Sequence, residues 1–291
     1  MKTHSLLKKQ VTKKQVTTFA VSRDNKLLAY ATNEEDYIKG NSIFVYELEA
    51  QKQVAQMQSG NFRTIKFLLF IPGTSYLAYV FENEVAINDI STGETISQIK
   101  VPAKVSAVSM IGDKLAISFL SGIVFLSTGT WEAVEMSSEF ENLIYVRGYG
   151  DVYAGVNKSG EIILNDIKNK SQVVFKTPFI CTSVQLSENR EIISGSCYSA
   201  PGFYLFGTKT RQEIKSGYPF SSIKVPAWDF NSSASRLALA ADTGMVTVLD
   251  TTGFETLAFE AVHKGPISNL LFMGESIVTS GLDGKILVST L

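Results

Sequence analysis

A pattern of short apolar runs separated by polar turns repeats along this chain, and it restricts the fold more than any other feature. Each unit contains four such runs, and the second run is the easiest to align between units. These second runs start 37 to 50 residues apart, at Leu27, Leu77, Leu115, Val152, Ile192, Leu237 and Ile277. Seven units of about 42 residues fill the chain of 291 residues, a spacing typical of propeller blades and not of helical solenoids.

The residue types in the runs indicate β-structure. Valine, isoleucine, phenylalanine and tyrosine dominate the runs, and no stretch keeps a helical apolar stripe for three turns. We therefore predict an all-β fold, a seven-bladed β-propeller of four-stranded antiparallel blades in one domain spanning 1–291. The predicted blades are 16–58, 62–100, 103–137, 141–177, 178–216, 221–260 and 263–291, the last completed by residues 3–9.

Several units also resemble a known repeat. VSRDNKLLAYA, followed by GNSIFVYELEAQK, resembles a WD-repeat blade, whose usual form is FSPDGKLLASGS and then DGTIRVWDLATG. The pattern returns in FIPGTSYLAYV with VAINDISTGETI, in FNSSASRLALAADTGMVTVLDTTG and in HKGPISNLLFMGESIVTSGLDGKILVS. The chain is thus similar to the WD-repeat propellers over most of its length, well in units 1, 2, 6 and 7 and poorly in units 3 to 5. The resemblance implies a non-catalytic interaction platform.

The chain departs from that family at the Trp-Asp dipeptide. The dipeptide is replaced by Asn88-Asp89, Asn165-Asp166 and Leu249-Asp250, and Ser289 stands at the tryptophan position of unit 7. The resemblance implies a buried hydrogen-bond network that survives only around His263, Thr279 or Ser280, and Asp283. We expect these side chains to stabilise unit 7, and apolar packing between neighbouring sheets to hold the other blades.

The ends of the chain are expected to close the ring. Unit 7 reaches Leu291 after its third strand, and the segment Thr3–Lys9 precedes unit 1. If this segment pairs beside Lys285–Thr290, it supplies the missing outer strand, as in WD-repeat proteins, and removes an exposed sheet edge.

Charge and hydropathy exclude several partners. The chain has 27 basic and 28 acidic side chains, so it lacks the positive charge that dominates nucleic-acid affinity. It contains no apolar run of roughly 18 residues and no signal-peptide core near its start. We predict no nucleic-acid binding and no membrane insertion, and we expect an intracellular protein, cytoplasmic with the nucleus also open.

Catalytic and metal chemistry has little support. Only two histidines are present, His4 and His263, so a three-histidine metal site is impossible. A Ser-His-Asp triad would need His263, which we interpret as a structural turn residue. No phosphate-binding glycine motif occurs, and Glu34 to Asp36 lack the ligand spacing of a calcium loop. We predict no catalytic residue, no metal and no cofactor.

Two cysteines flank one predicted turn. Counting outward from Ser187–Arg190 places Cys181 opposite Cys197 on antiparallel strands, which would bring their sulfurs close. We interpret them as buried reduced thiols in an intracellular chain, with a regulatory disulfide as the alternative.

Binding is expected on one face. In propellers of this kind, the loops between second and third strands and those leading to the next blade share one rim, and loops tend to carry function. Three are long, Thr32–Asn41, Ser196–Gly202 and Ser216–Lys224, and aromatic anchors are enriched at protein interfaces. The predicted partner contacts are Tyr37, Ile38, Lys39, Tyr198, Tyr218, Phe220 and Lys264.

Two functions remain open from the sequence. The first is a scaffold or adaptor subunit of a hetero-complex that binds a protein or peptide on this rim. The alternative is a propeller that exchanges guanine nucleotides on a GTPase, or one that binds a small ligand, with the long first-blade loop as its working element.

Overall fold

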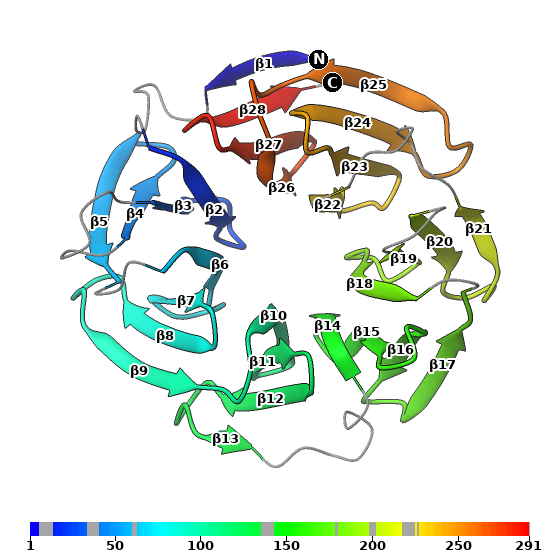
Figure 1. The fold of residues 1–291 in the computed structure, drawn as a ribbon, viewed down its shortest axis with the longest axis horizontal. Coiled ribbons are helices and arrows are strands. Elements are labelled where there is room, and N and C mark those ends of the chain that lie inside the picture. The colour runs from blue at the N-terminus through cyan, green and yellow to red at the C-terminus, as the bar shows by residue number, and fades with distance from the viewer. Residues whose placement is uncertain are drawn as a thin grey trace.

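Seven antiparallel sheets stand around a central axis. The computed structural model describes residues 1–5, 14–33, 41–59, 63–134, 143–177, 180–197, 202–216, 225 and 227–290. In these ranges 28 strands form seven four-stranded sheets and no helix is present. Figure 1 shows the sheets as blades of a ring, each with one strand nearest the axis. The predicted fold class, a seven-bladed β-propeller, is confirmed.

Each of the first six blades is a meander that begins at its inner strand. Blade 1 consists of β2 (Val16–Val21), β3 (Leu27–Thr32), β4 (Ser42–Glu47) and β5 (Lys52–Gln58). Blade 2 consists of β6 (Ile65–Phe70), β7 (Tyr76–Phe81), β8 (Glu84–Asp89) and β9 (Thr95–Lys100). Blade 3 consists of β10 (Val105–Ile111), β11 (Lys114–Phe119), β12 (Gly122–Ser127) and the short β13 (Ala133–Val134).

The remaining blades follow the same order. Blade 4 consists of β14 (Leu143–Tyr149), β15 (Val152–Asn157), β16 (Ile162–Asp166) and β17 (Ser171–Phe175). Blade 5 consists of β18 (Cys181–Leu186), β19 (Ile192–Cys197), β20 (Phe203–Gly207) and β21 (Glu213–Ser216). Blade 6 consists of β22 (Ala227–Phe230), β23 (Arg236–Ala240), β24 (Met245–Asp250) and β25 (Thr256–Ala261). Blade 7 contains β26 (Ile267–Met273), β27 (Ser276–Gly281) and β28 (Ile286–Thr290).

The outer strand of blade 7 comes from the other end of the chain. Strand β1 (Lys2–Ser5) pairs antiparallel with β28, from Lys2 opposite Thr290 to Ser5 opposite Leu287. The hydroxyls of Thr3 and Ser289 lie 3.0 Å apart across this pair. Both chain ends meet at this blade in Figure 1. Ring closure by the N-terminal segment is therefore confirmed, although residues 6–9 of the predicted segment lie outside the described residues.

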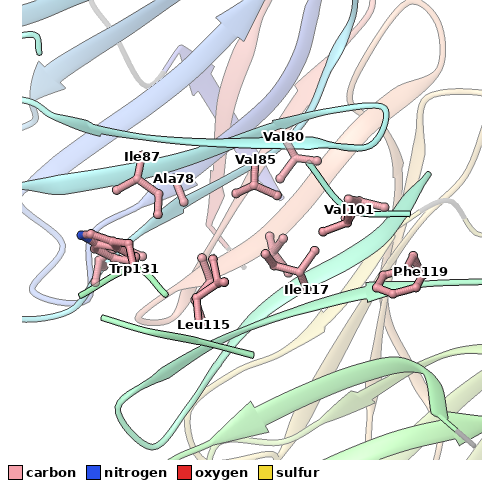
Figure 2. Close-up of a cluster of buried hydrophobic side chains, with 13 residues drawn as sticks. Ala78, Val80, Val85, Ile87, Val101, Leu115, Ile117, Phe119 and Trp131 are labelled. Carbon is pink, nitrogen blue, oxygen red and sulfur yellow. The ribbon is translucent and has the colours of Figure 1, made fainter. Parts of the chain in front are cut away.

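The apolar core is divided into seven clusters, each between two neighbouring blades. Between blades 2 and 3, Val85 and Ile87 of β8 face Leu115 and Ile117 of β11, and Trp131 covers one end (Figure 2). Because both faces of every blade are covered in this way, second strands such as β3, β7 and β11 are almost continuously buried. Outer strands such as β5 and β9 are mostly exposed.

Candidate binding face and central channel

Strand direction sorts the connections onto two faces of the ring. In a meander of four strands, the turn between second and third strands and the connection to the next blade lie on the same face. We call this the loop face. The turns between first and second strands and between third and fourth strands lie on the opposite face.

Exposed apolar side chains occur on the loop face. Leu120 lies in the turn between β11 and β12 and is 76% exposed, and Ile180 lies just before β18 and is 64% exposed. Leu282, in the turn between β27 and β28, is 38% exposed. None of these three residues is among the contacts predicted from the sequence. A detectable signal was present, because Leu120 and Leu282 are apolar residues in otherwise polar strand turns of blades 3 and 7.

The predicted contact residues fall mainly outside the described part. Tyr37, Ile38, Lys39, Tyr198, Tyr218 and Phe220 belong to the segments 34–40, 198–201 and 217–224, which are not among the described residues. The strand ends that flank these segments, from Thr32 to Ser42 in blade 1 for example, lie on the loop face. Lys264 is described, and it is exposed on the same face just before β26.

A buried histidine holds the loop face of blade 7 together. His263 Nδ1 lies 2.9 Å from Asp283 Oδ1, and its Nε2 lies 2.9 Å from the hydroxyl of Thr279. The amide of Lys264 donates to the other carboxylate oxygen of Asp283. The hydroxyl of Ser280, the other candidate at the strand position, lies 2.7 Å from that of Ser268. His263 is thus fully engaged in a turn contact within blade 7.

The electrostatics of this contact keep the histidine neutral and the aspartate charged. Burial lowers the pKa of His263, against the opposing effect of Asp283. Burial alone would raise the pKa of Asp283, but the hydrogen bond from His263 and the amides of Lys264 and Lys285 lower it overall. Near neutral pH, a neutral imidazole therefore donates from Nδ1 to a carboxylate.

Turns on the loop face also contact the next blade. Gly244, in the β23–β24 turn, accepts hydrogen bonds from the amides of Val262 and His263. A Cβ at Gly244 would lie 2.3 Å from the carbonyl oxygen of His263, and the backbone there has φ +88°. Gly160 makes an equally close approach to Ile180 before blade 5. Glycine at these turns lets neighbouring blades meet, which fixes where Lys264 and Ile180 stand.

A cavity of about 530 Å³ runs along the axis, lined by residues of all seven inner strands. Side chains on the inner strands reach the unpaired inner edges of the neighbouring blades. Ser106 donates to the carbonyl of Ile144, and Arg147 Nη1 donates to the carbonyl of Val108. Asn269 donates to the carbonyl of Phe19. These bonds satisfy edge groups that have no strand partner.

One carboxylate joins three blades in this channel. Asp229 of β22 accepts from the side-chain amide of Gln185 in blade 5 and from the backbone amide of Phe272 in blade 7. Burial raises the pKa of Asp229 to about 6, against the effect of these donors.

At the loop-face end of β6, burial and the neighbouring Lys104 lower the pKa of Lys66 to about 8. The channel thus links blades through polar contacts.

Metal and membrane features are not found in the described part of the chain. No group of three or more His, Cys, Asp and Glu side chains stands there in an arrangement that would hold a metal ion. No helix within the described ranges is suited to spanning a membrane. The first-blade loop on which the nucleotide-exchange alternative depends lies in residues 34–40, outside the described ranges.

Comparison with known proteins supports the fold. No family model and no curated protein sequence matches this chain. Among solved structures, it is similar to Hsv2 of Kluyveromyces marxianus with TM-score 0.73 and 15% identity, covering 95% of this chain and 97% of the other. It is also similar to the β-propeller domain of Cps50 (Swd1) of Myceliophteria thermophila, with TM-score 0.77, 11% identity and 99% of both chains covered. The resemblance to WD-repeat seven-bladed propellers is thus confirmed for the fold.

Proposed function

We propose that this protein is a non-catalytic interaction platform, a scaffold or adaptor subunit that binds a protein or peptide on its loop face. The observation that carries the proposal is the exposure of Leu120 and Ile180 on that face. When a partner covers aliphatic side chains that a fixed turn holds in water, their removal from water favours binding.

The binding free energy expected from covering these side chains sets the size of effect that an experiment must detect. Covering two largely exposed aliphatic side chains contributes about 3 kcal/mol, which corresponds to roughly a hundredfold in Kd. Lys264 stands on the same face and offers a charge for the polar margin of an interface. Tyr37, Ile38, Lys39, Tyr198, Tyr218 and Phe220 belong to segments that join strand ends on this face, so we propose them as further contacts.

The proposal requires no reactive group on the protein. His263 is committed to Asp283 and Thr279, and Asp229 is committed to Gln185 and Phe272. Both titratable groups therefore have a structural task that accounts for their burial.

The test compares two variants that remove similar apolar surface from different places. Leu120→Ser with Ile180→Ser changes the loop face, whereas Leu257→Ser with Phe259→Ser changes exposed side chains on the outer strand β25. Tagged proteins are used for affinity capture from extract of the native cell, and bound proteins are quantified by mass spectrometry.

We expect a stoichiometric partner to be lost with the loop-face variant and kept with the β25 variant. A second loop-face variant, Tyr218→Ala with Phe220→Ala, should also weaken capture without lowering the melting temperature. Equal retention of the partner by the loop-face and β25 variants would contradict the proposal. Melting curves of all variants serve as the control for folding.

A further inference from the structure

The two cysteines of the chain form a close pair at the loop-face end of blade 5. Cys181 begins β18, Cys197 ends β19, and the two residues are direct partners in the antiparallel register. Their sulfurs lie 2.9 Å apart, and the side chains are 0% and 6% exposed. Both are reduced in this structure.

The backbone around the pair has the geometry in which side chains approach most closely. The amide of Cys181 donates to the carbonyl of Gly160 in blade 4, and the amide of Cys197 donates to the carbonyl of Gly202. Because both amides point away from the partner strand, the cysteines occupy a non-hydrogen-bonded pair. The register shifts just after Cys181, so the pair lies at the end of the regular ladder, and in regular pairs of this kind the Cα atoms are about 4.5 Å apart, within the range that disulfides span.

We propose that Cys181 and Cys197 are a redox modification site that hydroperoxides convert reversibly to a disulfide. The strands already hold both sulfurs close together, so bond formation requires small side-chain rotations and no strand movement. With the sulfurs 2.9 Å apart on paired strands, formation of the bond and its reduction by a dithiol each require only a local change at the two side chains.

The reaction balances with one peroxide for each bond. The Cys181 sulfur attacks an oxygen of the peroxide, the O–O bond breaks, and the thiol becomes a sulfenic acid as water or an alcohol leaves. The Cys197 sulfur then attacks the Cys181 sulfur, the S–O bond breaks and a second water leaves. Two electrons pass from the thiols to the peroxide, and both thiol protons end in the released water or alcohol.

The surroundings assign different roles to the two sulfurs. The hydrogen-bond contact between the two thiols is the main influence that lowers the pKa of Cys181, with Thr177 at 3.7 Å acting in the same direction and burial opposing both. The same contact with Cys181, and burial, raise the pKa of Cys197. Cys181 is therefore the sulfur that reacts first, and Cys197 resolves the sulfenic acid. Because the pair packs against apolar residues such as Ile162 and Phe175, oxidation should be slow.

The test uses the full chain, whose only two cysteines are these. The reduced protein is treated with hydrogen peroxide, its thiols are counted with and without denaturant, and the linkage is mapped by mass spectrometry of peptides. We expect both thiols to disappear together within one chain and to return with dithiothreitol. The oxidised form should also melt at a higher temperature, because the bond closes a loop between residues 16 apart in sequence.

Two single variants test the assigned roles. Cys197→Ala should accumulate a sulfenic acid at Cys181 that dimedone traps, and Cys181→Ala should give much less adduct at Cys197. Thiols that survive peroxide in the folded protein but react after unfolding would overturn the proposal, as would disulfides only between chains. The wild-type result decides the proposal even if a variant folds poorly.

Discussion

Removal of the N-terminal strand should destabilise the whole ring. Deletion of the first twelve residues removes β1, whose four residues pair with β28 from Thr290 to Leu287. These four residue pairs correspond to roughly four backbone hydrogen bonds, and at about 1 kcal/mol each they contribute about 4 kcal/mol. With an unfolding entropy of about 0.6 kcal/mol/K for a chain of this length, the melting temperature should fall by roughly 7 °C.

Loss of β1 should also change solubility. Strand β28, with Ile286 and Val288 buried at 0% and 4% exposure, would become an open sheet edge. Differential scanning calorimetry gives the melting temperature, and light scattering reports aggregation in the same samples. A control replaces Lys2 with Ala, which leaves the strand in place. A truncated protein that melts within about 1 °C of the full chain would refute ring closure by β1.

Three further outcomes follow from individual side chains. Asp229→Asn should remove a pH dependence of the free energy of unfolding. Because folding raises the pKa of Asp229, its contribution to stability is lost as the pH rises from 3.8 to about 6. Over that window the free energy of unfolding, measured with urea, should fall by about 3 kcal/mol more in the wild type than in the variant. Asp283→Ala should lower the free energy of unfolding by about 2 kcal/mol near neutral pH, because it leaves a buried His263 nitrogen without its partner; a loss below about 0.5 kcal/mol would contradict this role. Gly244→Ala should cost more than about 2 kcal/mol, since its Cβ would meet a backbone carbonyl at positive φ, whereas Gly253→Ala should be nearly neutral, and equal melting temperatures would count against the close approach.

The repeat period predicted the fold because every blade needs the same four runs. Each blade covers the apolar face of its neighbour, so the pattern must return at nearly constant spacing, and the seven clusters lie where this argument requires. The alignment between units was less accurate. The position of Leu77 in blade 2, which pairs with Phe70, is taken in blades 1, 4 and 5 by Leu28, Tyr153 and Ile193. The predicted run starts Leu27, Val152 and Ile192 are therefore one residue early. Runs in which every residue is buried give little information about register.

Where the Trp-Asp dipeptide is replaced, the remaining aspartate still makes hydrogen bonds to the following turn. Asp89 and Asp250 still accept hydrogen bonds from amides of the turns that follow them, in blades 2 and 6. Asn165 donates to the hydroxyl of Tyr153, and Ser289 contacts Thr3 of the closing strand. These partners come from elsewhere in the blade, so no short motif predicts them.

The sequence predicts which face of the ring carries the long loops, but not which side chains on that face are exposed. Topology places the loops between second and third strands on it, but exposure depends on what each turn packs against. Leu120 stands out into solvent, whereas Trp131, in a turn of the same blade on the opposite face, is 8% exposed and packs into the cluster shown in Figure 2. Channel contacts such as that of Gln185 with Asp229 join residues 44 apart in sequence, and no local sequence pattern predicts them.

The most direct test of the central claim is a map of the surface that a partner covers. The protein and its captured partner are compared with the protein alone by hydrogen exchange and by cross-linking mass spectrometry. Our account predicts slower exchange and cross-links at the loop face, around Leu120, Ile180 and Lys264, and unchanged exchange on the outer strand β25. Protection confined to β25 or to the opposite face would show that the partner binds elsewhere and would contradict the account.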